Sequence, residues 1–349
     1  MTPPRRRREL DESDVRVRPN PQGSRPRTKE RPRHEDSTPG WVAAVDRGRY
    51  TVLLGGPEEP GGQVTAMKAR ELGRAGVVVG DRVALVGDVS GDPGTLARIV
   101  RVEERSSLLR RSADDVDPLE RPVVANADQL AVVAALADPE PRPRLVDRAL
   151  VAAYDAGLDP LLVLTKADLA GPAPFLAAYA PLDVPSVVTE RVTGPGGQPE
   201  IKGLDAVRAR LAGRVTVLIG HSGVGKSTLV NALVPGALRA TAEVNVVTGR
   251  GRHTSTSAVA LPLPGGGWVV DTPGVRSFGL AHVNPDRIVA AFPDLAVGTA
   301  GCPRGCSHDE PDCALDAFVA AGDAGPAGPA RLESLRRLLR SRAGAPDEG

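Results

Sequence analysis

The distribution of apolar and polar positions divides the chain into regions with different predicted elements. Beginning near Gly40, short runs rich in Val, Leu and Ile are separated by Gly and Pro, a pattern typical of short strands joined by turns. These runs predict strands at 41–45, 49–54, 77–86 and 96–102. Several short strands within about 65 residues favour a small barrel, and an OB-fold fits this size. OB-folds commonly bind nucleic acid, although a barrel without a ligand has the same pattern.

A second pattern, in which strands alternate with helices, runs from about residue 106 to residue 295. Apolar runs of the kind found in parallel strands buried on both faces occur at 129–136, 160–164 and 214–219. Helical spacing of apolar residues occurs between them, at 145–156 and 204–211. The alternation predicts an α/β domain with a parallel sheet.

The C-terminal part has a third pattern. A segment that contains all the cysteines follows Phe292, and after it the stretch 331–340 places Leu at helical spacing with Arg opposite. This amphipathic helix either packs on its own domain or presents a basic surface to RNA. The chain is therefore predicted to be multi-domain, with an OB-fold β-barrel, a central α/β domain and a mostly helical C-terminal domain at 39–105, 106–291 and 292–349.

The first segment, residues 1–38, is predicted to be a disordered basic arm. It contains 11 Lys and Arg against 7 Asp and Glu, many Pro, and no aliphatic periodicity. Two interpretations stay open: the arm contacts RNA phosphates, or it is a solvated leader with no fixed role.

Composition excludes some classes of protein. The net charge of the 349 residues is +1, so nucleic-acid binding would have to come from local patches. No run of about 18 apolar residues occurs, and the basic start at 1–8 is not followed by an apolar signal-peptide core. We expect a cytoplasmic monomer without membrane contact, in which the reduced cysteines are metal ligands or free thiols.

A phosphate-binding loop lies between the apolar run 214–219 and a helix expected at 227–233. Its glycines let backbone N–H groups close around phosphate oxygens, and the helix N-terminus adds a favourable dipole. Lys226 is expected to reach the β- and γ-phosphates, and Ser227 to bind Mg²⁺. The nucleotide-binding residues predicted here are Gly220, His221, Ser222, Gly223, Val224, Gly225, Lys226, Ser227 and Thr228.

A second element, Asp271-Thr272-Pro273-Gly274, follows the short apolar run 267–270. An acid at a strand end downstream of a phosphate-binding loop fits the Walker-B role, so Asp271 is expected to hold Mg²⁺. The N–H of Gly274 can contact the γ-phosphate. The sequence Asp-Thr-Pro-Gly alone is a common turn. It indicates a nucleotide site here because a phosphate-binding loop precedes it in the chain.

A third element, Thr165-Lys166-Ala167-Asp168, ends the run 160–164 and resembles the Asn-Lys-x-Asp element of GTPases. The Asp168 carboxylate can accept two hydrogen bonds from guanine N1–H and N2–H₂, a donor pair that adenine lacks. Lys166 would lie along the base, and a helix cap at Asp168 is the alternative interpretation. The element precedes the phosphate-binding loop, the reverse of the usual order, so a circularly permuted domain is expected.

The cysteines form a metal-binding pattern. Three thiols and one imidazole lie within a short segment, at Cys302, Cys306, His308 and Cys313. Three Cys and one His suit a tetrahedral structural Zn²⁺ without an open position. Free thiols are the alternative, and zinc would stabilise a segment too small to fold by itself.

A barrel, a permuted GTPase and a cysteine segment, in this order, resemble the RsgA (YjeQ/YloQ) family of GTPases that depend on the small ribosomal subunit. The phosphate-binding loop matches the family's except at His221, where Gln is usual. The stretch 249–256 is similar to the first switch of the family. The cysteines and His308 match its zinc ligands, with spacings one residue shorter.

The resemblance implies a role in late maturation of the 30S ribosomal subunit. It implies GTP hydrolysis to GDP and phosphate that the subunit stimulates, and 16S rRNA contact through the barrel and zinc domains.

Slow intrinsic hydrolysis is expected because Val275 follows Gly274, where a Ras-like enzyme carries a Gln that orients water. His253 is the candidate that orients or deprotonates water once the subunit orders its loop. Contact of His253 with RNA is the alternative. Thr254 is the predicted Mg²⁺-sensing threonine, with Thr256 as the second choice.

Two other functions are compatible with the motifs. One is a nucleotide-gated RNA-binding placeholder on the subunit in which hydrolysis is incidental. The other is a P-loop ATPase, against which Asp168 argues.

Overall fold

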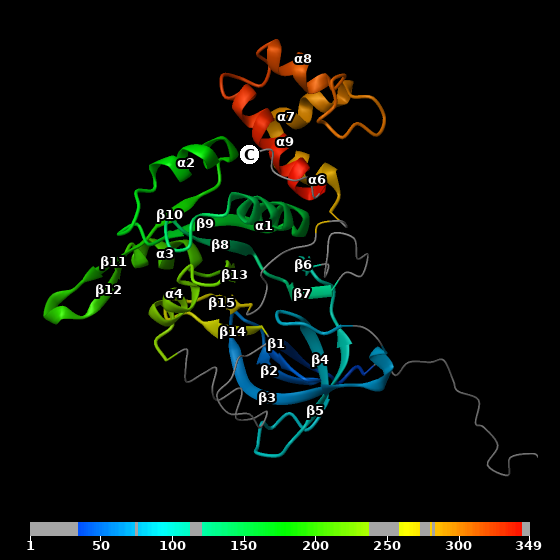
Figure 1. Ribbon diagram of the computed structural model, residues 1–349. Helices are drawn as coiled ribbons and strands as arrows, with labels where there is room; N and C mark the ends of the chain where they lie inside the picture. The colour runs from blue at the N-terminus through cyan, green and yellow to red at the C-terminus, as the bar shows by residue number, and fades with distance from the viewer. Residues whose placement is uncertain are drawn as a thin grey trace, which may run out of the picture. The chain divides into compact units, whose positions relative to one another are not determined.

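A computed structural model describes residues 34–73, 76–111, 121–236, 258–272, 280 and 283–343, and its elements are labelled in Figure 1. Apart from His34 and Glu35, these residues belong to one compact unit. Within the described ranges, no helix is long and apolar enough to cross a membrane. Short 3₁₀ turns occur at η2 (Arg70–Leu72), η3 (Ala180–Leu182), η4 (Pro195–Gly197) and η5 (Val297–Gly301).

The N-terminal strands form a closed five-stranded barrel. Its strands are β1 (Thr38–Asp46), β2 (Arg49–Gly55), β3 (Pro60–Lys68), β4 (Arg82–Gly87) and β5 (Ala97–Val102). Their order is β1-β2-β3-β5-β4, and β4 also pairs with β1, which closes the barrel. Only β3 and β5 pair in parallel among these strands. The interior is filled by apolar residues that include Val42, Val52, Leu85 and Ile99.

The barrel differs from the predicted strands in two places. The sequence did not predict β3, because it begins with Pro and two Gly and its apolar alternation starts only at Val64. The run 77–86 is not one strand, because the chain turns at Gly80, where φ is 89°. The Asp81 carboxylate stabilises this turn by accepting the Val78 N–H at 2.8 Å. Strand β4 therefore begins at Arg82.

The α/β domain has a sheet in the order β10-β9-β8-β13-β15-β14. All of its pairings are parallel except that of β14 with β15. The strands are β8 (Gln129–Ala135), β9 (Asp159–Thr165), β10 (Ser186–Val188), β13 (Val215–Ile219), β14 (Val259–Pro262) and β15 (Trp268–Asp271). The helices are α1 (Pro143–Ala156), α2 (Ala173–Tyr179), α3 (Leu204–Leu211) and α4 (Lys226–Leu233).

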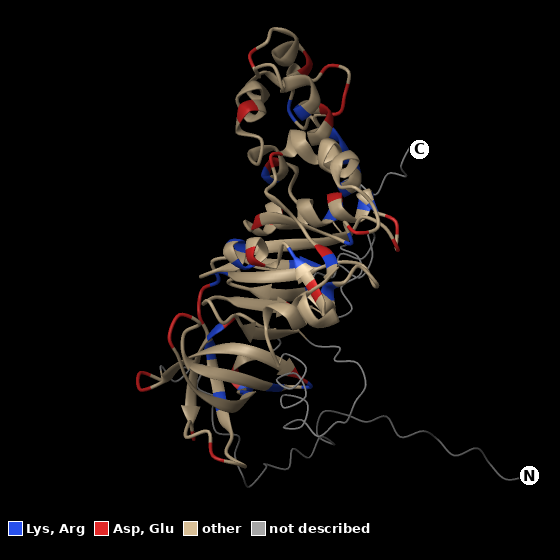
Figure 2. Cartoon of the chain, turned by 90° about the vertical axis from the view of Figure 1, so that its left-hand side faces the viewer, with Lys and Arg blue, Asp and Glu red and all other residues tan. Residues whose placement is uncertain are grey.

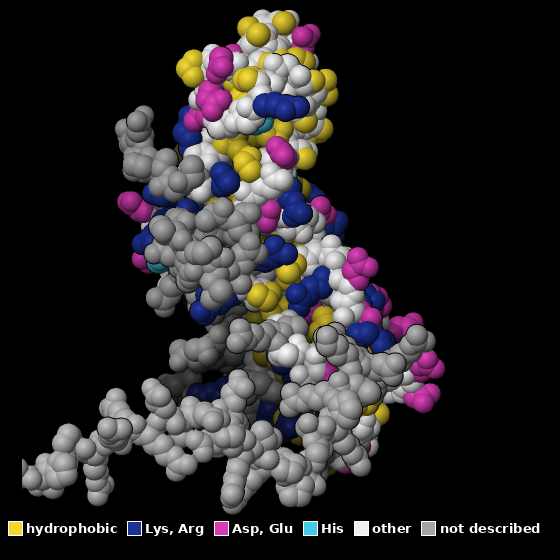
Figure 3. Space-filling view, turned by 90° about the vertical axis from the view of Figure 1, so that its right-hand side faces the viewer, with side chains coloured by type: hydrophobic (Ala, Val, Ile, Leu, Met, Phe, Trp, Pro, Cys, Tyr) yellow, Lys and Arg dark blue, Asp and Glu magenta, His cyan; other side chains and the backbone are white. Residues whose placement is uncertain are grey.

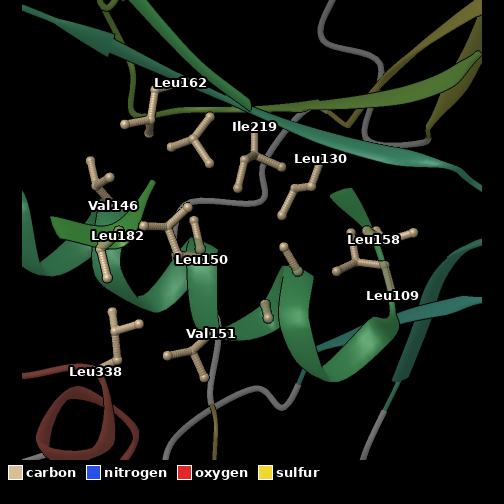
Figure 4. Packing of buried hydrophobic residues seen from close by; sticks show 14 of the residues in the cluster. Leu109, Leu130, Val146, Leu150, Val151, Leu158, Leu162, Leu182, Ile219 and Leu338 are labelled. Carbon is tan, nitrogen blue, oxygen red and sulfur yellow. The ribbon is translucent and has the colours of Figure 1, made fainter. Parts of the chain in front are cut away.

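Helices cover both faces of this sheet, which explains why its strands are apolar throughout. Successive residues of β8 belong to different clusters: Leu130 and Val132 pack with α1, whereas Ala131 and Val133 pack with α3 and α4. Figure 4 shows the first cluster, in which Leu130, Leu162 and Ile219 of the sheet lie above Val146 and Leu150 of α1.

Two hairpins lie outside the main sheet. One joins β6 (Leu108–Arg111) to β7 (Arg121–Ala125), and the other joins β11 (Glu190–Thr193) to β12 (Pro199–Lys202). The second hairpin connects β10 to α3, and its residue Arg191 contacts Asp168 just after the end of β9.

The barrel and the α/β domain share one continuous sheet. Strand β1 pairs with β14 in antiparallel orientation, with Ala44 opposite Val259. Beside this pairing, the rings of Trp41 and Trp268 lie 4.9 Å apart, and Trp268 Nε1–H donates to Pro57 O at 2.8 Å. The strand that follows the expected first switch is thus attached directly to the barrel.

Helix α6 (Pro285–Ala290) leads from the α/β domain into the C-terminal region, whose helices are α7 (Pro293–Ala296), α8 (Ala314–Ala320) and α9 (Gly328–Ala343). The leucines of α9 are buried in the same core cluster as α1, at Leu332, Leu335, Leu338 and Leu339. This helix therefore packs with its apolar face on the protein, on α1 of the α/β domain as well as on its own region. Contact of its basic face with RNA stays a prediction.

Charged residues of both signs are interspersed on the described elements (Figure 2). On the face shown in Figure 3, Lys and Arg side chains of the described residues likewise alternate with Asp and Glu. This mixture agrees with the net charge of +1.

Candidate nucleotide site and metal centre

The phosphate-binding loop lies at the carboxyl end of β13, a central strand of the sheet. It occupies the residues between Ile219, which ends β13, and Lys226, which begins α4. A Cβ at position 220 would meet Val133 O at 2.5 Å, and φ of Gly225 is 92°, so both positions require glycine. The backbone therefore approaches its neighbours closely and delivers the helix N-terminus to the loop.

Lys226 and Asp271 form an ion pair at this edge. Lys226 Nζ lies 3.0 Å from Asp271 Oδ1, and both side chains are largely buried. Because β13 and β15 are adjacent and parallel, with Leu218 opposite Asp271, their carboxyl ends bring the two residues together. Ser227 occupies the first turn of α4 beside them. A lysine, a hydroxyl and a carboxylate here suit a nucleotide phosphate with Mg²⁺.

The guanine element lies at the same edge, at the end of β9. Thr165 Oγ1 donates a hydrogen bond of 2.6 Å to Val224 O of the phosphate-binding loop. Lys166 has φ of 60°, and its Nζ donates to Asp138 O. The structure thus joins elements whose order in sequence is reversed, and the joining residue is Thr165.

Asp168 does not cap a helix. The next helix, α2, begins at Ala173, and its N-cap is Pro172 without a side-chain hydrogen bond. Instead, Asp168 Oδ1 accepts the backbone N–H of Arg191 at 3.0 Å. This bond fixes the carboxylate and leaves its second oxygen available.

Two contacts of the site were not predicted. The Arg191 N–H comes from β11, which borders a cavity of about 640 Å³ between the hairpin, α3 and Thr228 of α4. A backbone donor has no residue-type signature, and no Ser-Ala motif marks this loop.

The other contact joins Arg142 Nη1, just before α1, to His221 Nε2 at 2.9 Å. His221 Nδ1 lies 2.9 Å from Ser222 O, so the side chain bridges the loop and α1.

Five predicted residues lie outside the described residues: His253, Thr254, Thr256, Gly274 and Val275. Their roles stay predictions.

The four proposed metal ligands form one cluster. Their ligand atoms all lie within 4.8 Å of one another. Cys302 Sγ lies 3.6 Å from His308 Nδ1 and 3.8 Å from Cys313 Sγ, and Cys313 Sγ lies 3.9 Å from His308 Nδ1. A tetrahedral zinc ion has edges of about 3.5 to 3.8 Å between such ligands. The spacing fits a metal and is far too long for a disulfide.

Burial raises the pKa of the Cys306 and Cys313 thiols. Without a metal these thiols are protonated at neutral pH, so metal binding must displace protons from them.

Comparison with known proteins identifies the family. The family model described as RsgA GTPase matches residues 102–281. The chain belongs to the RsgA GTPase family. Membership confirms the predicted family and the predicted GTP hydrolase activity.

Curated relatives match most of the chain. The "Small ribosomal subunit biogenesis GTPase RsgA" of Pseudomonas aeruginosa strain PAO1 is 39% identical over 273 residues, 76% of each chain. The protein of that name from Gemmatimonas aurantiaca is 38% identical over 274 residues, 78% of this chain and 86% of the relative.

Solved structures have the same fold. YjeQ from Thermotoga maritima matches with a TM-score of 0.60 and 26% identity, over 89% of this chain and all of the other. YloQ, "a circularly permuted GTPase", matches with a TM-score of 0.59 and 22% identity, over 90% of this chain and 98% of the other. The predicted fold class, a barrel followed by a permuted α/β domain and a C-terminal region with a possible zinc site, is confirmed.

Proposed function

We propose that this GTPase acts in late maturation of the 30S ribosomal subunit. In this proposal it binds the subunit, contacts 16S rRNA, and hydrolyses GTP to GDP and phosphate when the subunit stimulates it. The name of the relatives, small ribosomal subunit biogenesis GTPase, supports the small ribosomal subunit as the partner. The proposed partner places the protein in the cytoplasm, where we propose that it works as a monomer.

The observation that carries the proposed chemistry is the contact between the guanine element that contains Asp168 and the phosphate-binding loop. Thr165 ties the two elements together with a 2.6 Å hydrogen bond, and Arg191 N–H orients the Asp168 carboxylate. We propose that Asp168 binds guanine N1–H and N2–H₂, with Lys166 along the base. Adenine would leave the carboxylate without donors, which costs affinity.

The Lys226–Asp271 pair is the proposed resting state of the phosphate side. When GTP binds, Lys226 would turn to the β- and γ-phosphates, and Asp271 and Ser227 would then be free to hold Mg²⁺. The ion would supply charge neutralisation at the phosphates. Lys226 and Asp271 neutralise each other before binding, so neither charge is left unpaired in this half-buried position.

We further propose that Cys302, Cys306, His308 and Cys313 hold one structural zinc ion. The ligand spacing supports this identity. The proposed units are the arm 1–38, the barrel 39–105, the permuted GTPase domain 106–291 and the zinc-binding region 292–349, of which the barrel and the zinc-binding region contact rRNA.

His253 is the proposed catalytic residue, with Thr254 as the Mg²⁺-sensing threonine and the Gly274 N–H at the γ-phosphate. Replacement His253→Ala should abolish turnover stimulated by the 30S subunit, because no group then orients water, and should leave GTP affinity nearly unchanged. Phosphate release with purified subunits and equilibrium GTP binding measure the two quantities. Stimulated turnover equal to that of the unmodified protein would remove His253 from the mechanism.

A further inference from the structure

Two adjacent arginines of α9 face different parts of the protein. Arg336 contacts the loop of the proposed metal centre, and Arg337 contacts α1 of the GTPase domain. Neither residue stood out in the sequence, where both belong to the polar side of an amphipathic helix. Their contacts give α9 a role beyond packing.

Arg336 holds the backbone of the ligand His308. Its Nε–H donates to His308 O at 2.9 Å, while its two terminal nitrogens donate to both oxygens of Asp316 in α8, at 2.9 and 2.7 Å. The Arg336 side chain is only 16% exposed. One guanidinium thus joins α9, α8 and the metal-binding loop.

His308 needs such support because its backbone is in the left-handed region, with φ of 64°. A residue other than glycine persists there only when its surroundings hold it. The His308 N–H donates to Cys306 Sγ at 3.3 Å, and its carbonyl is held by Arg336. These bonds direct the imidazole Nδ1 towards Cys302 and Cys313.

Arg337 holds the other side of the helix. Its Nε lies 3.1 Å from Asp147 Oδ2 of α1, in a carboxylate that is 5% exposed, and its guanidinium lies 5.0 Å from the centre of the Tyr179 ring. The next residue of α1, Arg148, donates to Ser341 O of α9 at 3.2 Å. Leu338 adds apolar contact on the α1 side, as Figure 4 shows.

We infer that Arg336 is a positioning residue for the metal ligand His308, and that α9 links the metal centre to the GTPase domain. Metal binding orders the loop whose His308 carbonyl accepts from Arg336, and packing of α9 on α1 holds Arg336 in place. Metal binding and the packing of α9 therefore stabilise each other. Loss of the Arg336 contact with His308 or of the Arg337 contact with Asp147 should thus lower metal affinity. This inference rests on the proposed metal centre.

The test measures zinc affinity by competition with a chromophoric chelator in the full-length protein. Arg336→Met should weaken zinc binding about ten- to hundredfold, as loss of a group that orients a metal ligand usually does. Arg337→Met, which leaves every contact of the metal loop intact, should weaken it about three- to thirtyfold through the linkage. The matched control is Arg101→Met, an exposed arginine of β5 that pairs with Glu103 and makes no contact with the metal loop, and zinc affinity should change less than about fivefold.

A cobalt spectrum separates positioning from loss of stability. In Arg336→Met, the d–d bands of bound Co²⁺ should shift, because the imidazole is no longer aimed. In Arg337→Met saturated with Co²⁺, the d–d bands should match those of the unmodified protein, because only the contact between α9 and α1 is lost and the metal ligands keep their positions. Arg336→Lys keeps the charge but cannot bond His308 O and both Asp316 oxygens, so it should not restore affinity. Asp316→Asn weakens the contact that holds Arg336 but keeps Arg336 itself, so it should give an intermediate loss of zinc affinity. This variant replaces Arg336→Met in the test if Arg336→Met does not fold.

Each result has one meaning. Equal zinc affinity in the unmodified protein, Arg336→Met and Arg337→Met overturns the inference and leaves the metal centre standing. Full rescue by Arg336→Lys overturns positioning by the guanidinium. If the unmodified protein binds neither Zn²⁺ nor Co²⁺, the proposed metal centre fails, and this inference fails with it.

Discussion

Thr165 is the residue at which the permuted site is held together. Its hydroxyl is buried and donates to Val224 O at 2.6 Å, so a direct hydrogen bond joins the guanine element to the phosphate-binding loop. Many GTPases carry Asn at this place, and here the Thr hydroxyl makes the contact with the loop.

Thr165→Val should therefore weaken nucleotide binding. Valine keeps the shape but leaves the Val224 carbonyl without this donor, a loss of about 1–3 kcal/mol. Release of a fluorescent GDP analogue should become about tenfold faster. The control is Thr193→Val, at an exposed position in β11. Release at the unmodified rate in both variants would show that the hydrogen bond does not restrain the loop.

Residues whose chemistry demands a fixed type and spacing could be predicted from the sequence. The phosphate-binding loop, Asp168, Asp271 and the cysteine cluster belong to this class, and the structure brings the members of each site together. Arg191 could not be predicted, because its contribution to the site is a backbone N–H. Arg142 and Arg336 act through contacts far along the chain that local patterns do not encode.

At the scale of elements, a third arginine, Arg331, joins α9 to α7 and to the GTPase domain. Arg331 of α9 makes two hydrogen bonds to Asp294 of α7, at 2.5 and 2.7 Å, and donates to Pro181 O at 2.8 Å. Its guanidinium also lies 5.2 Å from the centre of the Phe292 ring. The hydrogen bond from Arg331 lowers the pKa of Asp294.

Asp294→Asn should cost about 1–2 kcal/mol of unfolding free energy at neutral pH. A carboxyl whose pKa is lowered by folding contributes fully above its unfolded pKa of about 3.9, and the contribution is lost as the pH falls through the folded value. The difference between the two proteins should thus be constant down to about pH 5 and shrink below about pH 4. Urea unfolding across this range measures it.

The control for this comparison is Asp92→Asn, at an exposed position in the turn between β4 and β5, which should match the unmodified protein throughout. A difference between Asp294→Asn and the unmodified protein that persists unchanged at pH 3 would mean that the ion pair is not its cause.

Strands with a strong apolar sequence pattern were predicted correctly, and strands with a weak pattern were missed. The long apolar strands β8, β9 and β13 were predicted closely because burial on both faces leaves few polar residues in them. Strand β3 and the β11–β12 hairpin were missed because glycine, proline and charged residues break their alternation. Their pairing partners, rather than local sequence, determine their structure.

At the scale of the whole molecule, the reversed order of motifs does not disturb the site. The strand order β9-β8-β13-β15 places the carboxyl ends of these parallel strands at one edge, whichever strand comes first in the chain. The permutation instead changes which regions adjoin the strands of the site. Strand β14 pairs with β1 of the barrel, and the chain beyond β15 continues into the C-terminal helices. Nucleotide-dependent movement at either place would reach a neighbouring region directly.

Turnover of GTP and ATP, each with and without purified 30S subunits, tests the central claim most directly. The account predicts slow GTP hydrolysis by the protein alone, strong stimulation by the subunit, and little hydrolysis of ATP in either condition. Equal hydrolysis of ATP and GTP, or GTP turnover that the subunit does not change, would contradict it.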